Sequence, residues 1–170
     1  MKPILFLILC FSIGSWAHKK PQRAYHAHSH GHAHLSIAFD NLKGQVEFKS
    51  PADSILGFEH EPKSDQDKKK VTDTTADFES KIANYVQFDA SSLCVFAIKK
   101  IAMVPDEKQK SHADFVAQYD VTCSKPVLNT RLILDFSAYK KIKNIETVIL
   151  IGELQLKPEI KSDKTTIELK

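Results

Sequence analysis

The sequence predicts an α+β domain in which a largely antiparallel sheet of short strands packs against one main α-helix. Two observations lead to this fold class. Several short segments alternate apolar and polar side chains with a period of two, and one longer segment, residues 64–85, carries apolar side chains at helical spacing. A length of 170 residues, with 42% hydrophobic and 26% charged residues and no internal repeat, fits a single globular domain.

Residues 1–17 have the composition of a secretory signal peptide. Lys2 is followed by an apolar run over residues 4–13. Ser15 and Ala17 then supply the small residues at the −3 and −1 positions of a cleavage site, and we expect cleavage after Ala17. The apolar run is shorter than the roughly 18 residues that a transmembrane helix needs, so no membrane span is expected in the mature chain. A lipoprotein signal at Cys10 is an alternative, but a leucine precedes it where a small residue is required. The sequence therefore predicts export, with the periplasm as the default compartment.

A polar tail over residues 18–33, expected to be disordered, precedes the predicted domain at 34–170. The domain opens with a strand, because Leu35, Ile37 and Phe39 alternate with small or polar side chains. A turn at residues 40–44, which contains a glycine, connects this strand to a second one. Together they predict a β-hairpin that ends at a proline.

Residues 55–60 are predicted to form a short apolar strand or loop that leads to the main helix. Ser64 is the expected N-cap of this helix, and Asp67 three positions later resembles a capping box. One face of the helix is predicted to enter the core through Val71, Thr75, Phe78, Ile82 and Tyr85. Further strands are expected at residues 93–104, 115–123, 131–136, 146–151, 154–160 and 165–169, with a charged loop at 105–111. In the strand at 115–123, Phe115, Ala117, Tyr119 and Val121 are predicted to share one side.

Two cysteines, Cys94 and Cys123, remain after removal of the signal peptide. In an exported chain such a pair predicts one disulfide, which closes a loop of 29 positions (123 minus 94) and contributes roughly 3 kcal/mol in the chain-entropy model. Two buried free thiols are the alternative. Metal binding by this pair is disfavoured, because its spacing resembles no CxxC-type zinc site.

Five histidines alternate strictly between residues 26 and 34, in a chain that has only eight: His26, His28, His30, His32 and His34. Imidazole is the commonest protein ligand for zinc and also suits copper and nickel. Residues two apart in an extended chain lie on one side, the residues between them are small, and Gly31 can supply a bend. The tract predicts binding of Zn²⁺, with Cu²⁺ or Ni²⁺ as alternatives. An incidental polar tail, an affinity tag and a pH sensor are the other interpretations.

A structured metal site also needs ligands from the folded body, and two further histidines are candidates. His60 lies between two glutamates, Glu59 and Glu61, in a loop that leads to the helix. His112 lies close to Asp114 at the entry to the strand at 115–123. Simple solvent exposure is the alternative for both histidines. Because ligation requires neutral imidazole, affinity should fall as pH drops through about 6.5.

Other function classes find little support in the sequence. A net charge of +3 is too small to indicate nucleic-acid binding. The chain contains no HExxH, GxSxG or glycine-rich phosphate loop, so we expect no enzymatic activity and no catalytic residues. The mature chain of 153 residues (170 minus 17) is also too short for the (β/α)₈ barrel of metal-dependent hydrolases. We expect a monomer.

Two segments resemble those of the ZrgA-like periplasmic zinc-binding proteins. The sequence HSHGHAHLSIA at 28–38 resembles the family's HxHGxAxLxVA opening, and SPADSILGFEHEP at 50–62 resembles its SPAxNLxGFEHxP segment. Later landmarks follow in order at Leu93-Cys94, His112-Ala113-Asp114-Phe115, Tyr119 and Thr122-Cys123, so the resemblance covers essentially the whole mature chain.

The resemblance implies periplasmic zinc binding in support of a zinc ABC importer, whose periplasmic binding protein is the expected partner. It also strengthens Glu59 and His60 as metal ligands. Many members carry a second His- and Asp-rich loop, whereas residues 105–110 here contain no histidine. The N-terminal tract should therefore carry most of the zinc. A copper- or nickel-buffering protein and a small zinc-dependent enzyme are the alternative functions.

Overall fold

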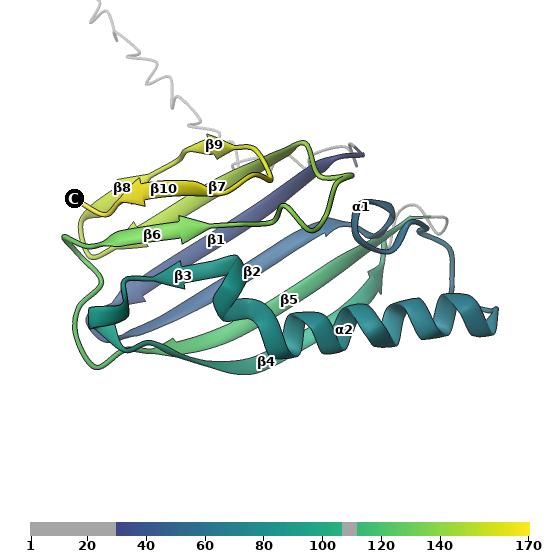
Figure 1. Ribbon diagram of the computed structural model, residues 1–170, viewed down its shortest axis with the longest axis horizontal. Helices are drawn as coiled ribbons and strands as arrows, with labels where there is room; N and C mark the ends of the chain where they lie inside the picture. The colour runs from purple at the N-terminus through teal and green to yellow at the C-terminus, as the bar shows by residue number, and fades with distance from the viewer. Residues whose placement is uncertain (1–29, 107–111) are drawn as a thin grey trace, which may run out of the picture.

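The computed structural model describes residues 30–106 and 112–170. A seven-stranded sheet forms the back layer, with strand order β4-β5-β2-β1-β7-β8 and β9 also paired to β7. Its strands are β1 (His32–Asp40), β2 (Lys43–Pro51), β4 (Val95–Pro105), β5 (Ala113–Thr122), β7 (Asn144–Ile151), β8 (Leu154–Leu156) and β9 (Glu159–Ile160). In front of it lies a second layer formed by α2 and a small sheet (Figure 1). The predicted fold class is confirmed.

The small sheet has three strands, in the order β10-β6-β3. They are β10 (Thr165–Glu168), β6 (Arg131–Leu134) and β3 (Val86–Phe88), and a 3₁₀ turn, η1 (Ala90–Ser92), follows β3. Its separation from the large sheet was not anticipated, because alternation along a strand does not say which sheet the strand joins. The core lies between the two layers, where Phe48 of β2 stacks on Phe136 with ring centroids 4.8 Å apart.

The first hairpin forms as predicted. Leu35, Ile37 and Phe39 are buried while Ser36 is exposed, and the chain reverses between Asp40 and Lys43. β1 also pairs with β7 in parallel, with His34 opposite Glu146. The large sheet is therefore mixed, and β1 lies in its interior with a partner on both sides.

The main helix, α2 (Asp65–Tyr85), begins where the sequence predicted. The Ser64 hydroxyl accepts a hydrogen bond of 3.0 Å from the Asp67 amide, which satisfies one of the unpaired N–H groups of the first turn. Phe78, Ile82 and Tyr85 are buried as expected. The predicted face is off by one position at its threonine. Thr74 of α2 is buried, whereas Thr75, which was expected in the core, is only half-buried.

Residues 55–60 were expected to form a strand or loop. Residues 57–60 do form a loop, but residues 55 and 56 belong to a short helix, α1 (Ala52–Leu56). Pro51 stands before its first turn, and Gly57 ends it in the left-handed conformation, with φ 89°. Its buried side chains include Ala52, Ile55 and Leu56. The apolar side chains of this segment therefore form one buried helical face.

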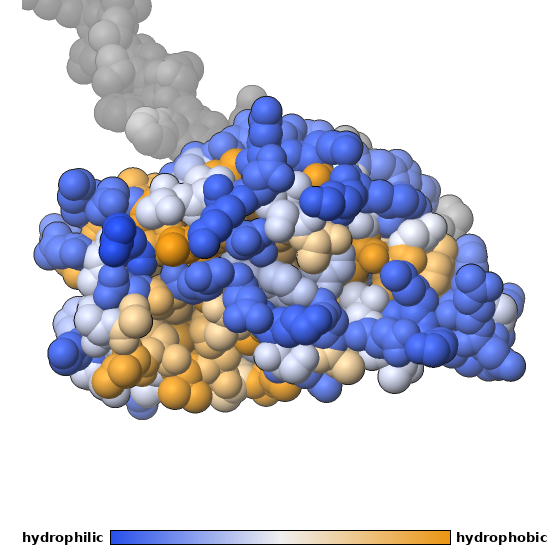
Figure 2. All heavy atoms as spheres, in the orientation of Figure 1, coloured by the Kyte–Doolittle hydropathy of each residue, from blue (hydrophilic) through white to orange (hydrophobic). Residues whose placement is uncertain are grey.

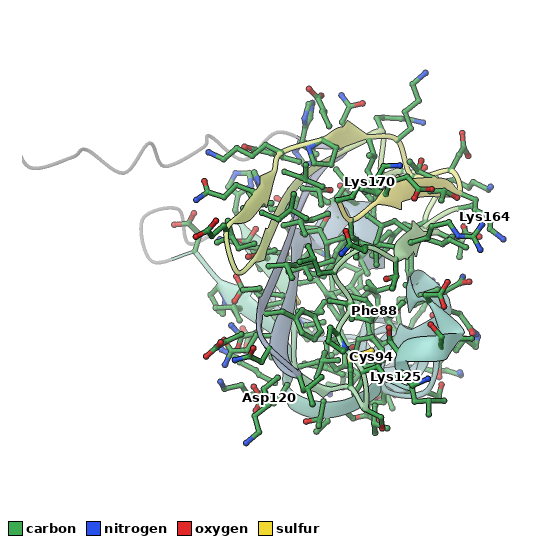
Figure 3. The ribbon with its side chains drawn as sticks, turned by 90° about the vertical axis from the view of Figure 1, so that its left-hand side faces the viewer. Phe88, Cys94, Asp120, Lys125, Lys164 and Lys170 are labelled. Carbon is green, nitrogen blue, oxygen red and sulfur yellow. A yellow bond between two sulfur atoms is a disulfide. The ribbon has the colours of Figure 1, made fainter. Side chains whose placement is uncertain are left out.

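The predicted disulfide joins Cys94 to Cys123, with Cα atoms 3.9 Å apart. These residues flank the paired positions Val95 and Thr122, so the bridge closes one end of the β4–β5 pair. Figure 3 views the molecule from this end, with the bridge at Cys94.

Apolar surface gathers over β3 and the first half of β4 (Figure 2). Leu93, Val95 and Ile98 are the large apolar side chains most exposed within the described ranges, at 62%, 68% and 52%. β4 forms one edge of the large sheet, so this surface adjoins an edge strand. In residues 30–106 and 112–170, neither helix combines the length and the apolar character that crossing a membrane would require.

Candidate metal centre

Three chain segments meet at the end of the sheet where β1 and β5 begin. They bring together four side chains, from His30, Asp53, Glu59 and His112, which we call the Glu59 cluster. His30 Nδ1 lies 3.5 Å from Asp53 Oδ2 and 3.7 Å from Glu59 Oε1. On the other side of Glu59, Oε2 is 2.5 Å from His112 Nδ1. Glu59 is thus the link between two histidines that are far apart in sequence.

The carboxylate of Glu59 is unusually buried for an acidic side chain. Its side chain is only 9% exposed, and its Oε1 has no hydrogen-bond partner within the described part of the chain. Leaving a buried carboxylate oxygen unsatisfied is costly, and a bound cation would offset that cost. The open oxygen is the one that faces His30.

Asp53 was not among the residues selected from the sequence. Its Oδ1 accepts a hydrogen bond of 2.8 Å from Lys141, while its Oδ2 faces His30. The hydrogen bond and charge of Lys141, with a smaller contribution from His30, outweigh desolvation and lower the pKa of Asp53. Asp53 is therefore a carboxylate at neutral pH. Its position in the 50–62 segment was a usable signal, but only the fold brings it to His30.

Gly31 separates His30 from the histidines that follow it. Its φ of 82° lies in the left-handed region, and a Cβ there would meet the Lys141 carbonyl oxygen at 3.1 Å. The Gly31 amide donates a hydrogen bond of 3.0 Å to the Ser54 hydroxyl in α1. His30 consequently turns toward Asp53 and Glu59, whereas His32 and His34 continue along β1.

His32 and His34 point to the face of the large sheet opposite the core, because Ala33 and Leu35 between and after them are buried. His34 Nδ1 lies 3.2 Å from Glu146 Oε2 on β7. Nothing in the sequence pointed to Glu146, which lies 112 positions from its partner (146 minus 34). The three histidines of the tract that the structure describes are therefore divided between two places on the molecule.

His60 takes a different position from its neighbour Glu59. Its ring stacks on Phe58 with centroids 4.9 Å apart, and its Nδ1 is 3.0 Å from the Glu61 carbonyl oxygen. The structure thus brings Glu59 to His30 and His112 but directs His60 elsewhere. His26 and His28 lie outside the described residues.

No group of three His, Cys, Asp or Glu side chains within residues 30–106 and 112–170 is arranged to hold a metal ion. In the Glu59 cluster, the candidate ligands lie a few ångströms apart, and some of them already have hydrogen-bond partners within the protein. Two tetrahedral ligands with bonds of about 2.0–2.1 Å are roughly 3.3 Å apart. The separations of 3.5 and 3.7 Å from His30 Nδ1 to the two carboxylates are slightly larger than that. His30 is therefore close to both carboxylates.

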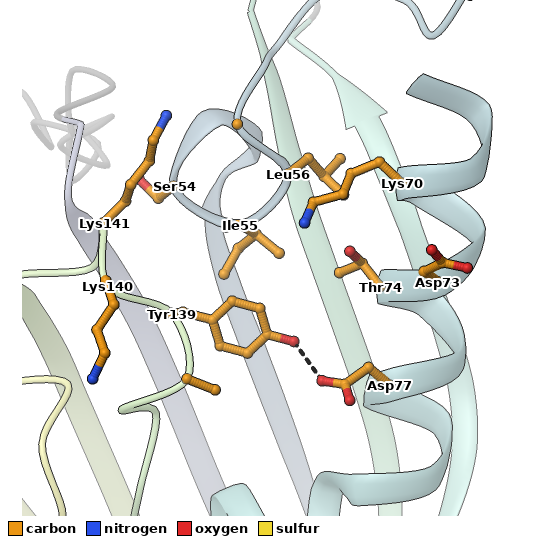
Figure 4. A pocket seen from close by; sticks show the side chains of 12 residues that line it. Ser54, Ile55, Leu56, Lys70, Asp73, Thr74, Asp77, Tyr139, Lys140 and Lys141 are labelled. Carbon is orange, nitrogen blue, oxygen red and sulfur yellow. Dashed lines mark hydrogen bonds between the residues drawn. The ribbon is translucent and has the colours of Figure 1, made fainter. Parts of the chain in front are cut away.

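A cavity of about 510 Å³ lies between α1, α2 and the loop at residues 138–141, and Lys141, the partner of Asp53, lines it. Figure 4 shows Tyr139 reaching across it to Asp77 of α2, with an oxygen–oxygen distance of 2.8 Å. Burial opposes ionisation of Asp77, but hydrogen bonds from Lys81, Tyr85 and Tyr139 outweigh it and lower the pKa of Asp77. Burial and Asp77 also raise the pKa of Tyr85 to about 12. This network ties α2 to the loop that carries Lys141.

The fold and the cluster define a β-rich domain that brings imidazole and carboxylate side chains together at one end of a mixed sheet. The family model described as ZrgA family zinc uptake protein matches residues 27–169. The chain belongs to this family, as its sequence segments indicated, and has a role related to zinc uptake. A comparison with curated proteins found no match.

Proposed function

We propose that this protein captures zinc in the periplasm and passes it toward a zinc importer. The Glu59 cluster is the site on the folded domain, with His30, Asp53 and Glu59 as ligands. His112 holds the Glu59 carboxylate in place through its hydrogen bond of 2.5 Å. The single observation that carries the proposal is the buried Glu59 Oε1, which lacks a hydrogen-bond partner among the described residues and faces His30.

The chemistry of these groups favours zinc over calcium or magnesium. Zinc accepts nitrogen and oxygen ligands in a tetrahedral arrangement, whereas calcium and magnesium require oxygen ligands at higher coordination numbers. The histidine tract enters the domain at His30, so His26 and His28 are close in sequence to supply a further ligand. Exchange of His26 for His28 as this further ligand would keep one coordination position open, so that an ion can enter and leave.

A protein that passes an ion on must not hold it in a complete, closed set of ligands. Two of the proposed ligands are partly committed elsewhere, since Asp53 is paired with Lys141 and Glu59 with His112. These competing partners weaken the hold on zinc and offer each carboxylate an alternative once the ion leaves. The arrangement supports delivery to a tighter binding protein, and we propose no catalytic step.

Affinity alone does not distinguish zinc from copper or nickel, because copper binds most nitrogen and oxygen sites more tightly than zinc does. Metal analysis of the protein isolated from its native compartment makes this distinction. Zinc in the isolated protein, and induction of the gene by zinc starvation, support uptake. Copper or nickel, with induction by metal excess, would instead support the buffering function.

The site is tested by zinc titration calorimetry on the mature chain at pH 7.5. Glu59→Gln removes the charge and one ligating oxygen with little change in volume, so we expect zinc affinity at the tightest site to fall at least 10-fold. Glu61→Gln is the matched control, since Glu61 lies in the same loop with its side chain 80% exposed. If both variants bind zinc as the parent does, the Glu59 cluster is not the site.

A further inference from the structure

We propose that residues 93–98, from just before β4 to its middle, bind an extended segment of another protein, which adds a strand to the large sheet. We call these residues the β4 edge. The segment that fits has apolar side chains on the core side and an acidic side chain beside Lys100 on the opposite side. This inference does not depend on the zinc site, which lies at the other end of the β4–β5 pair.

The backbone of β4 is open to a further strand. β4 is the outermost strand on one side of the large sheet and pairs with β5 alone within the described residues. On such a strand, about half of the N–H and C=O groups point away from the single neighbour and remain available for pairing. Val95, Ala97 and Ile98 are all exposed, so the described part of the chain leaves this half uncovered. Figure 1 shows β4 along the lower margin of the sheet.

Apolar side chains are exposed along the β4 edge on the side that faces the core. Ile98 is the register partner of the buried Tyr119 and therefore projects from the core face, yet it is 52% exposed. Leu93, just before the strand, is 62% exposed. Figure 2 shows apolar surface gathered over this part of the molecule. A partner strand would extend the core face of the sheet and cover these side chains.

A hollow beside the β4 edge can accept an apolar side chain of the partner. It has a volume of about 430 Å³ and lies between β3, the 3₁₀ turn and the start of β4, with Phe88, Leu93 and Phe96 in its wall. Asp89 and Asp135 also line it. A carboxylate of the partner is therefore disfavoured at this end of the β4 edge.

Two lysines mark the other end of the β4 edge and define the charge of the partner. Lys100 is the register partner of Gln118, so it projects from the face opposite the core. Lys99 Nζ lies 3.6 Å from Asp120 Oδ1, whereas Lys100 forms no ion pair within residues 30–106 and 112–170. A carboxylate on the added strand would pair with Lys100. The hollow and the lysine together require a segment that is apolar at one end and acidic at the other.

The second half of β4 is protected against pairing, whereas the first half is not. Natural edge strands carry lysines, prolines or bulges that prevent uncontrolled association. Here a bulge interrupts the ladder between Ile98 and Lys100, and both lysines follow residue 98. These features confine strand addition to the β4 edge.

A second copy of this chain fits the β4 edge poorly. β4 contains two lysines and no aspartate or glutamate, so another β4 supplies no carboxylate for Lys100. The exposed apolar side chains are also far fewer than the roughly 20–30 residues that each partner contributes to a stable interface. Transient addition of one strand suits this size, because main-chain hydrogen bonds supply affinity and alternate side chains supply specificity.

The test is fluorescence anisotropy with labelled peptides of alternating valine and threonine, about six residues long to match a typical strand. The terminal threonine is replaced by glutamate in one peptide and by lysine in its counterpart, and each pair is made with the charge at either end. We expect the mature chain to bind the glutamate peptide, in one of the two directions, about five-fold more tightly than the lysine peptide. Backbone N-methylation of the peptide should abolish binding.

Variants of exposed residues locate the contact without disturbing the core. Ile98→Thr should weaken binding of the glutamate peptide about five-fold. Leu150→Thr is the matched control, since Leu150 is also exposed but lies on β7. Lys100→Glu should reverse the preference between the two peptides.

Three results would overturn the proposal: no saturable binding of the glutamate peptide, equal binding of the glutamate and lysine peptides, or unchanged binding by Ile98→Thr. Sedimentation velocity of the parent chain alone provides a further check. Dimers that Ile98→Thr abolishes would assign the β4 edge to a second copy and would also overturn the proposal.

Discussion

The Gly31 amide donates a hydrogen bond of 3.0 Å to the Ser54 hydroxyl, 23 positions away in the sequence. This bond fixes the start of β1 against α1 at the point where the histidine tract enters the domain. Lys143 and Asn144 amides, at 2.7 and 3.1 Å, bind the Gly31 carbonyl oxygen from the β7 side. The backbone of Gly31 is therefore held from two sides, and the fold sets the direction of the chain from His30 into β1.

Gly31→Ala should destabilise the domain and weaken zinc binding. A left-handed φ costs a side-chain-bearing residue roughly 1–2 kcal/mol, and here the added Cβ also meets backbone at 3.1 Å. Gly152→Ala is the matched control, since φ is 58° but no atom lies within 4 Å of the added Cβ. Urea unfolding and zinc titration of both variants measure the difference. Equal losses of stability and unchanged zinc affinity would contradict the role given to Gly31.

Asp77→Asn should lower the free energy of unfolding at pH 7 by about 2 kcal/mol, because Asp77 accepts hydrogen bonds from Lys81, Tyr85 and Tyr139. The pKa of Asp77 is lowered in the folded state, so its contribution is present above the unfolded value of about 3.9. It is lost as pH falls through the lower folded value.

The stability difference between the parent and Asp77→Asn should therefore shrink below about pH 4, as measured by urea unfolding from pH 7 to pH 2.5. Asp73→Asn is the control, because Asp73 is 58% exposed and is paired only with Lys69 among the contacts described. A difference that stays constant across this range would show that ionisation of Asp77 does not contribute.

Removing the disulfide should destabilise the domain without affecting zinc binding. The double variant Cys94→Ser/Cys123→Ser opens the bridge at one end of the β4–β5 pair and should cost about 3 kcal/mol in urea unfolding. His112 lies at the opposite end of β5, 11 positions from Cys123 (123 minus 112), which in an extended strand is roughly 36 Å. Zinc affinity measured at a temperature where the variant is folded should match the parent. A large loss would place the cysteines in the metal site.

Deletion of residues 18–29 tests how the tract and the domain share the metal. The variant loses His26 and His28 but keeps Gly31 and the whole of β1. We expect titration calorimetry to show fewer zinc ions bound per chain, with binding at the Glu59 cluster retained at lower affinity. Complete loss of zinc would assign the site to the tract alone, and an unchanged stoichiometry would exclude the deleted histidines.

Local patterns in the sequence predicted most of the secondary structure. Alternation gave β1 and β5, the Ser64 cap gave the start of α2, and the two cysteines gave the disulfide. These features depend on residues a few positions apart, or on one pairing with few alternatives. Residues 55 and 56 differed from the prediction because a short apolar run does not by itself distinguish a buried helical turn from a strand or loop.

The sequence by itself determined which residues are candidates for metal binding: the histidine tract, Glu59, His60 and His112. Only the tertiary structure decided how they group. In the fold, Glu59 lies between His30 and His112, and Asp53 contacts His30. The ring of His60 instead stacks on Phe58, and His34 lies beside Glu146. The physical reason is that the side chains that approach a metal ion come from strands and loops brought together by packing. Their sequence separations, from 23 to 112 positions here (53 minus 30 and 146 minus 34), leave no periodic signal along the chain.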